Sequence, residues 1–309
     1  MWHVCHVWHV YVCSPSFFRA QEDDDTTNKL ALVIGAGEQT LDATESAFIE
    51  SVESKFDIEH SKDYIREPLS TYTRASTAIY RDKRTGLAVG GELSVVVDDT
   101  IAKAAAWQMS RNSRRYQKSH YETNHEHPRV MVDVNDHHAI QYSCRVIKVP
   151  LFMTRDYCTR RIWKWSEDMS TLTYVRESIE HPDFPRVKHY NRGWTSITCV
   201  YEKMPPIGTI PQTRVQWKQF VEDPLRENPF TRFLFRKMLM KSMHFVKHMR
   251  DVFDKSVALD EYHRGTHLEN INKETKLGGS RYSEEVSAVV ARLLRIESNC
   301  FALSAIASH

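Results

Sequence analysis

The stretch that decides the fold is TRDYCTRRIWKW, residues 154–165, which reads as one long strand of a sheet. Side chains of a strand alternate between its two faces. One face therefore carries Tyr157, Thr159, Arg161, Trp163 and Trp165, and the other carries Cys158, Arg160, Ile162 and Lys164. We expect the first face to be buried, because it carries three aromatic rings, and the second to suit water better. Arg161 is thus predicted to lie among aromatic side chains.

A buried guanidinium needs an anionic or hydrogen-bonding partner, because an isolated buried charge is very costly. The pattern leaves two interpretations of Arg161 open. In the first, Arg161 anchors the polar head of an otherwise apolar ligand. In the second, it pairs with a carboxylate of the core, or extends its charged head to a rim.

The rest of the chain predicts an α+β protein. Strands are expected at residues 78–81, 87–98, 129–134, 137–149, 171–180, 188–204 and 210–221, and helices near residues 40–56, 101–109 and 229–255. Asp42 or Thr40 is expected to cap the first helix, and Asp98, Asp99 or Thr100 the second. Pro229 suits the first turn of the last helix. We expect a helix-grip fold, in which a curved antiparallel sheet wraps around the long C-terminal helix and encloses an apolar cavity.

Four segments follow one another in an order known from one family: RDYCTRR (155–161), YVRESIEHPDFP (174–185), KHYNRGW (188–194) and TRVQWKQFVEDP (213–224). With GGELSVVVDDTIAKAAAWQM (90–109) upstream, the chain resembles a START domain, the steroidogenic acute regulatory protein-related lipid-transfer family, over about residues 72–256. The residues that match its turn and strand motifs are Ser178, His181, Pro182, Pro185, Arg192, Thr213, Val215, Asp223 and Pro224. The resemblance implies an internal lipid site that the C-terminal helix closes as a lid.

Two departures from the family pattern bear on the ligand. The strand AIQYSCRVI (139–147) carries no carboxylate to face Arg161, where sterol-binding members are expected to have one. The turn after Asp223 and Pro224 is also altered, since Leu225 and Arg226 follow. An unpaired Arg161 suits a ligand that brings its own phosphate or carboxylate.

The predicted ligand site is built around Arg161 as the contact for the headgroup. We expect apolar tails to lie against Tyr142, Trp163, Trp165 and the methionines of the last helix, because methionine adapts to varied apolar ligands. The predicted ligand-binding residues are Arg161, Tyr142, Trp163, Trp165, Gln141, Arg176, Trp194, Trp217, Met238 and Met249.

We expect a lipid-binding or lipid-transfer protein that carries one amphipathic lipid, with an anionic headgroup favoured over a sterol. Two alternatives stay open: a lipid-sensing or protein-interaction module without transfer, and an enzyme on the same cavity fold. We expect no enzyme activity, no catalytic residue, no cofactor and no metal. The amino-terminal histidines (His3, His6, His9) lack a helical context for a metal site, and the histidines of residues 120–138 are expected in polar loops. Gly35 and Gly37 imitate a dinucleotide-binding turn whose third glycine is missing, so a turn before a helix is the preferred interpretation.

Composition agrees with a single-core globular protein of 309 residues, with 41% hydrophobic and 27% charged residues. The net charge of +2 gives no reason to expect nucleic acid. Six scattered cysteines favour a reducing compartment, so we expect a cytoplasmic monomer with transient, peripheral contact to a membrane surface. Residues 1–39 are expected to be a disordered or poorly structured tail, residues 40–256 the START-like domain, and residues 257–309 a linker and a C-terminal helix.

Overall fold

The computed structural model describes residues 25–37, 39–57, 63–72, 75–110, 113–125, 128–146, 154–222 and 248–277. Contacts divide the chain into two compact units, residues 1–254 and residues 255–309. The elements are α1 (Asp25–Ala36), α2 (Ala43–Ser54), β1 (Tyr64–Tyr72), β2 (Ala75–Asp82), β3 (Ala88–Val97), α3 (Ile101–Met109), α4 (Arg114–Asn124), β4 (Arg129–Asn135), β5 (His138–Arg145), β6 (Arg155–Trp165), β7 (Thr171–Ser178), β8 (Asn191–Arg192), β9 (Trp194–Ile207), β10 (Ile210–Glu222) and α6 (Ser256–Leu277).

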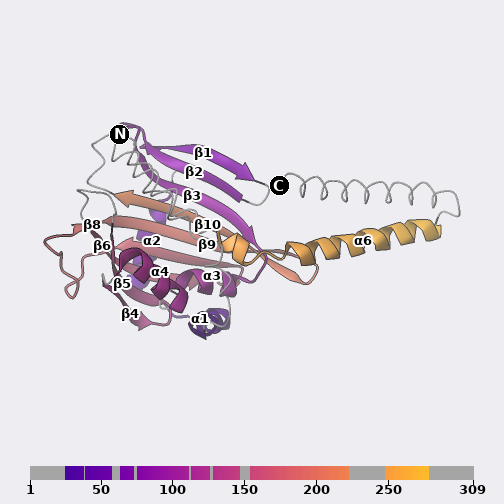
Figure 1. Cartoon of the computed structure of the whole chain (residues 1–309), viewed down its shortest axis with the longest axis horizontal. Coiled ribbons are helices and arrows are strands. Elements are labelled where there is room, and N and C mark those ends of the chain that lie inside the picture. The colour runs from indigo at the N-terminus through magenta and orange to yellow at the C-terminus, as the bar shows by residue number, and fades with distance from the viewer. Residues whose placement is uncertain are drawn as a thin grey trace, which may run out of the picture. The chain divides into compact units, whose positions relative to one another are not determined.

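The first unit is built on one large antiparallel sheet (Figure 1). The strand order is β1-β2-β3-β10-β9-β7-β6-β5-β4, and the short β8 pairs in parallel with β6 off this path. The predicted α+β class and curved antiparallel sheet are confirmed. Strand β1 and helix α4 are not predicted by the sequence pattern, and β8 and β9, which Gly193 separates, are predicted as one strand.

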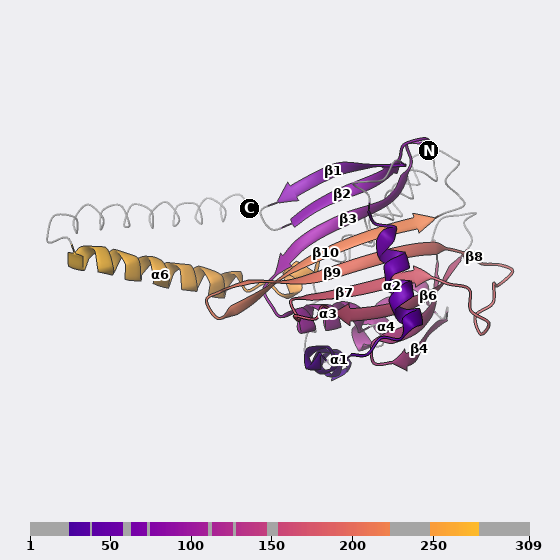
Figure 2. The same ribbon diagram turned by 180° about the vertical axis from the view of Figure 1, so that it is seen from behind.

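Helices cover both faces of the sheet. Helix α2 lies on one face, as Figure 2 shows, whereas α3 and α4 lie on the other. Ile162 and Val175 pack with Ile49 and Val52 of α2, and both strand residues are fully buried. The expectation that the Ile162 side of β6 suits water is therefore wrong, because a helix that the strand pattern does not reveal covers it.

The opposite face carries Arg161 and is called the arginine face below. Its apolar part includes Trp163, Tyr174, Ile197 and Trp217, which form one core cluster with α3. Met249 is fully buried in the same cluster. The core of the first unit thus lies mainly between the arginine face and the helices that cover it.

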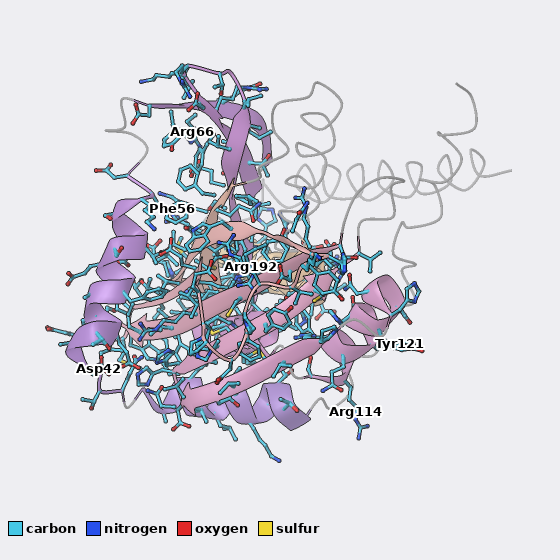
Figure 3. All side chains as sticks on the ribbon, turned by 90° about the vertical axis from the view of Figure 1, so that its left-hand side faces the viewer. Asp42, Phe56, Arg66, Arg114, Tyr121 and Arg192 are labelled. Atoms are coloured by element: carbon cyan, nitrogen blue, oxygen red, sulfur yellow. The ribbon has the colours of Figure 1, made fainter. Side chains whose placement is uncertain are left out.

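Two helix starts follow the predicted chemistry. Asp42 caps α2 by accepting from the backbone N–H of Glu45, and the Glu45 side chain accepts from the backbone N–H of Asp42 in return. Thr100 is the N-cap of α3, which selects one of the three candidates. Figure 3 marks both ends of the α2 segment, at Asp42 and Phe56.

The predicted amino-terminal tail is wrong for residues 25–36. These residues form α1, whose Ile34 is fully buried in the core, and Thr27 Oγ1 donates to Ser110 Oγ at 2.9 Å. Gly35 therefore lies within a helix, and Gly37 with its φ of 73° follows the end of that helix. An apolar stripe of α1 packed on α3 outweighs the polar residues that precede it.

Only part of the predicted carboxy-terminal structure lies within the described residues. Residues 248–252 of the predicted helix 229–255 are helical, whereas residues 223–247, with Met238 and the proposed lid, lie outside the described residues. In the second unit, residues 256–277 form α6, so the predicted linker is wrong there. The remainder of the predicted linker and C-terminal helix, residues 278–309, lies outside the described residues. None of the helices described is long and apolar enough to cross a membrane.

Candidate ligand-binding site

Arg161 is buried at the centre of the candidate site, with 5% of its surface exposed. Its Nε donates to the Tyr174 hydroxyl at 2.8 Å, and its Nη2 donates to the Met109 carbonyl at 3.0 Å, where α3 ends. Its Nη1 lies 3.6 Å from Met131 Sδ. All three partners are neutral, so they satisfy donors of the guanidinium without balancing its charge.

Within the described residues Arg161 makes no ion pair. The neighbour that β5 places opposite it is Ala139, and β7 places another cation, Arg176, on its other side. The predicted lack of a facing carboxylate on residues 139–147 is thus seen in the part of that strand that the structure describes. The second interpretation of Arg161 requires a carboxylate partner in the core, and the described contacts of Arg161 contain none.

A small cavity of about 90 Å³ lies beside Arg161. Its walls include Leu30 of α1, Met131 of β4, and Trp163 and Tyr174 of the arginine face. Asp133 and Asp136 also line it, but neither forms an ion pair with Arg161. Ligand pockets generally measure roughly 300–1,000 Å³, so this cavity is too small for an acyl chain. The large closed apolar cavity of the helix-grip prediction stays a prediction.

The structure sorts the predicted site residues between the two faces. Gln141, Trp163, Trp165, Arg176 and Trp217 share the arginine face with Arg161, as strand register requires. Met249 is buried in the core cluster on that face. Tyr142 and Trp194 belong to the opposite face.

Tyr142 is therefore wrong as a neighbour of Arg161. It pairs with Cys158 of β6, its ring stacks on Phe184 at 5.1 Å, and its hydroxyl donates to Asp156 at 3.2 Å. Burial raises the pKa of the Tyr142 hydroxyl far above its usual range. Because side chains alternate, a residue aligned with Cys158 cannot share the face of Arg161. The same register places Trp194 with Ser196 on the α2 face.

Protein atoms cover much of the two tryptophans that were assigned to a lipid tail. Trp165 Nε1 donates to the Ile34 carbonyl of α1 at 2.9 Å, and the Trp165 backbone N–H donates to Gln39 Oε1 at 3.1 Å. Trp163 meets the His137 ring edge-on, with centroids 6.0 Å apart. Residues 25–37 and Gln39, which were predicted to belong to a tail, thus supply part of the covering of the site.

A row of buried polar side chains continues the arginine face beyond Arg161. Its members are Gln141, Thr159, Ser178, Thr195 and Gln219, each at most 9% exposed. Most are satisfied locally; Thr159 Oγ1, for example, donates to the Gln141 carbonyl at 3.4 Å. The Gln141 Oε1 atom is buried and accepts no hydrogen bond from a described residue. Of these residues, only Gln141 was predicted as a ligand-binding residue, although the strand pattern had already placed Thr159 on the face of Arg161.

A second cluster holds α2 against the β4–β5 hairpin. Glu45 accepts from Asn135 Nδ2 at 3.0 Å, His137 Nε2 at 3.0 Å and His138 Nδ1 at 2.8 Å. His138 Nε2 accepts from Arg160 Nε at 3.0 Å, which makes this imidazole neutral, because arginine only donates. The expectation that His137 and His138 lie in a polar loop is wrong for His138, which is buried in β5.

The titration of this cluster follows from its contacts. Burial alone raises the pKa of Glu45, but hydrogen bonds from His137, the Asp42 backbone, Asn135 and His138 outweigh it and lower the pKa to about 2. Burial lowers the pKa of His138, and Arg160 adds to this effect, whereas Glu45 opposes it. Among the residues described, no group of three or more His, Cys, Asp or Glu side chains is placed to hold a metal ion.

Comparisons with known proteins give structural similarity only. No family model matches the chain, and no curated protein matches it in sequence. Human StAR-related lipid transfer protein 5 is similar in structure, at 15% identity and a TM-score of 0.48 over 67% of this chain and 95% of that one. Human STARD10 is 14% identical, with a TM-score of 0.49 over 74% of this chain and 86% of that one. The lipid transfer and protein localization domain of human StarD13 is 14% identical, with a TM-score of 0.43 over 70% of this chain and 100% of that one. What this chain resembles, in its sequence motifs and among solved structures, is the START domain.

Proposed function

We propose that this protein binds one amphipathic lipid with a phosphate or carboxylate in its headgroup, and that Arg161 contacts that group. The observation that carries the proposal is a buried guanidinium whose described partners are a hydroxyl, a backbone carbonyl and a thioether. Leaving a charge buried without a counter-ion costs several kcal/mol in general. A ligand that supplies the missing anion recovers this cost on binding.

The geometry favours an anionic group over a sterol. A guanidinium has five N–H donors, and two of those of Arg161 bond to oxygen atoms of the protein. The remaining donors can bind a phosphate or carboxylate with charge-assisted hydrogen bonds, which are about twice as strong as neutral ones. A sterol hydroxyl is neutral and leaves the charge of Arg161 unbalanced.

Loading of the lipid chain requires a covering segment to move. The cavity of about 90 Å³ is smaller than the roughly 300–1,000 Å³ of ligand pockets in general. Leu30 of α1 lines it, so a shift of α1 would widen it towards Trp163. Burial of each methylene then contributes about 0.8 kcal/mol, which is enough for stable carriage of a long chain. We assign binding and transport, rather than catalysis, to this site.

The test is native mass spectrometry of the full chain after incubation with liposomes of mixed zwitterionic, anionic and sterol lipids. The wild type is expected to gain one lipid with an anionic headgroup. Arg161→Met should lose this adduct, and Arg214→Met serves as the matched control. Arg214 lies on the opposite face of the same sheet, where it pairs with Glu202 at 2.9 Å.

The outcomes separate the parts of the proposal. Wild-type protein that gains no lipid rules out lipid carriage. A folded Arg161→Met variant that binds as tightly as the wild type removes Arg161 from the site. Transfer between donor and acceptor vesicles then separates a carrier from a lipid-sensing module, which binds lipid but does not move it.

A further inference from the structure

Gln141 is a buried amide beside Arg161 whose oxygen atom has no partner among the described residues. The residue is 9% exposed, and its Oε1 is buried and accepts no hydrogen bond. A buried polar atom that lacks a hydrogen bond costs the fold the full desolvation of that atom. A ligand that supplies the missing hydrogen bond recovers this cost when it binds.

The strand register places Gln141 next to Arg161 on the arginine face. Ala139 is aligned with Arg161 across β5 and β6, and Gln141, two positions further along β5, is aligned with Thr159. Arg161 and Gln141 are therefore diagonal neighbours, a separation that long side chains bridge. On its other side Gln141 is aligned with Met131, whose Sδ lies 3.6 Å from Arg161 Nη1. Met131 and Ala139 both line the cavity beside Arg161, so Gln141 borders the place where the proposed headgroup binds.

The two residues aligned with Gln141 do not supply the missing hydrogen bond. Thr159 Oγ1 donates to the Gln141 carbonyl at 3.4 Å, so its single hydroxyl proton is used on the backbone. Met131 carries only a thioether, which is a weak acceptor and no donor. The described fold thus leaves hydrogen-bonding capacity of the Gln141 side chain to a ligand.

We propose that Gln141 forms a hydrogen bond with a hydroxyl group that the ligand carries next to the anionic group on Arg161. This inference rests on the proposed function and narrows it to headgroups with a free hydroxyl, such as a phosphoglycerol. The amide of glutamine offers an acceptor oxygen and a donor nitrogen, and a turn of the amide exchanges the two. A hydroxyl both donates and accepts, so it matches either orientation.

The surroundings of Gln141 favour a hydroxyl over an ammonium group. An ammonium group only donates, so it matches one orientation of the amide alone. The diagonal neighbours of Gln141 on β4 and β6 are Arg129, Asp133, Tyr157 and Arg161. Arg161 is buried, whereas Asp133 is exposed to water. Water and salt screen an exposed charge more than a buried one, so repulsion from Arg161 outweighs attraction to Asp133.

The test is a competition between two lipids, followed by native mass spectrometry of the full chain. The liposomes contain equal amounts of phosphatidylglycerol and phosphatidylpropanol, which share acyl chains and a single negative charge but differ in the free hydroxyls of the first. The wild type should gain phosphatidylglycerol in about fivefold excess, the ratio that corresponds to one net hydrogen bond. Gln141→Leu should bind both lipids equally. Gln216→Leu, the matched control, should keep the preference, because Gln216 is aligned with Ser94 and Val200 on the opposite face.

A second variant and a stability measurement separate a ligand contact from a structural role. Gln141→Glu places a carboxylate diagonal to Arg161, where it competes with the ligand for the guanidinium. It should weaken binding of both lipids at least about tenfold. Thermal unfolding without lipid should show that Gln141→Leu is at least as stable as the wild type, because Oε1 has no described partner to lose.

The outcomes distinguish this inference from the proposed function. Equal adducts in the wild type, or a preference that persists in Gln141→Leu, overturn the role of Gln141 and leave the site at Arg161 standing. Normal binding by Gln141→Glu or a clear loss of stability in Gln141→Leu also overturns it. So does a larger adduct when phosphatidylethanolamine replaces phosphatidylglycerol in the competition, because that lipid offers an ammonium group instead of a hydroxyl. A wild type that gains none of these lipids contradicts the proposed function itself.

Discussion

Arg161 and Arg192 are both buried arginines on neighbouring parts of one sheet, and they differ in their counter-ion. Arg192 donates from Nε to Asp156 at 3.0 Å, and its Nη2 forms an ion pair with the same carboxylate at 2.9 Å. The side chains of Arg192 and Asp156 are 3% and 1% exposed, respectively (Figure 3 labels Arg192). Arg161 is about equally buried, yet its described partners are all neutral.

The difference shows that burial alone does not reveal the role of a charged residue. Arg192 also donates to the Phe184 carbonyl at 3.0 Å, so its ion pair fastens the turn after β7 to β6. Its charge is balanced by carboxylates of the protein without a ligand, so we assign it a structural role. Arg161 carries the charge that the described fold leaves unbalanced, which is why we assign the ligand to it.

The largest expected effect comes from breaking the complete pair. Asp156→Asn leaves Arg192 buried with only the exposed Glu180 as an anionic partner. Loss of the buried partner of such a pair typically costs about 3–5 kcal/mol. Urea denaturation should show this loss of unfolding free energy. Arg214→Ala, which removes a partly exposed ion pair with Glu202 elsewhere on the sheet, is the control and should have a much smaller effect. Equal effects for the two variants would deny Arg192 its structural role.

An intermediate loss of unfolding free energy is expected when the pH falls, because the partner of a third arginine is a histidine that titrates. Arg160 donates to the neutral His138, whose folded pKa is lowered. The unfolded state therefore binds more protons, so stability is full above the ordinary histidine pKa of 6.5 and falls as the pH drops below it. The lowered pKa of Glu45 adds a second loss as the pH falls from 4.5 towards about 2.

Unfolding free energy measured against pH checks this prediction. His138→Gln should flatten the profile just below pH 6.5, because the amide does not titrate, while Asp156→Asn should keep the slope there. A slope that survives in His138→Gln would show that another group titrates.

A smaller loss of unfolding free energy is expected from changing a neutral hydrogen-bond partner of Arg161, called its cradle below. Tyr174→Phe removes the hydroxyl that accepts from Nε and should lower the unfolding free energy by about 1–3 kcal/mol, since it leaves a buried donor without its partner. Thermal or urea unfolding measures this loss. If the Tyr174 hydroxyl holds Arg161 in position, lipid binding should weaken in parallel; unchanged lipid affinity would show that the cradle is not needed for binding.

The smallest expected effect on stability comes from Arg161 itself. Arg161→Met loses hydrogen bonds but also removes a buried charge without a counter-ion, so the unfolding free energy should change by about 1 kcal/mol or less. Comparison with Asp156→Asn by urea denaturation tests the contrast directly. A loss as large as that of Asp156→Asn would show that Arg161 is structurally paired like Arg192.

The sequence by itself determined the features that depend on local pattern. Alternation along residues 154–165 predicted a strand with a buried Arg161, and the described β5 residues contain no carboxylate that faces it. Side-chain chemistry at Asp42 and Thr100 predicted two helix starts, because a cap needs only neighbouring backbone N–H groups. These features are settled within a few residues of the chain.

Only the tertiary structure decided the features that depend on partners distant in sequence. A one-residue choice of register sent Tyr142 to the opposite face, and α1 proved to be a core helix that covers Trp165. The contacts of Arg161 come from the end of α3, from β4 and from β7, and Glu45 meets histidines more than ninety positions away. A local pattern specifies which side chains share a face, whereas packing between elements decides what that face meets.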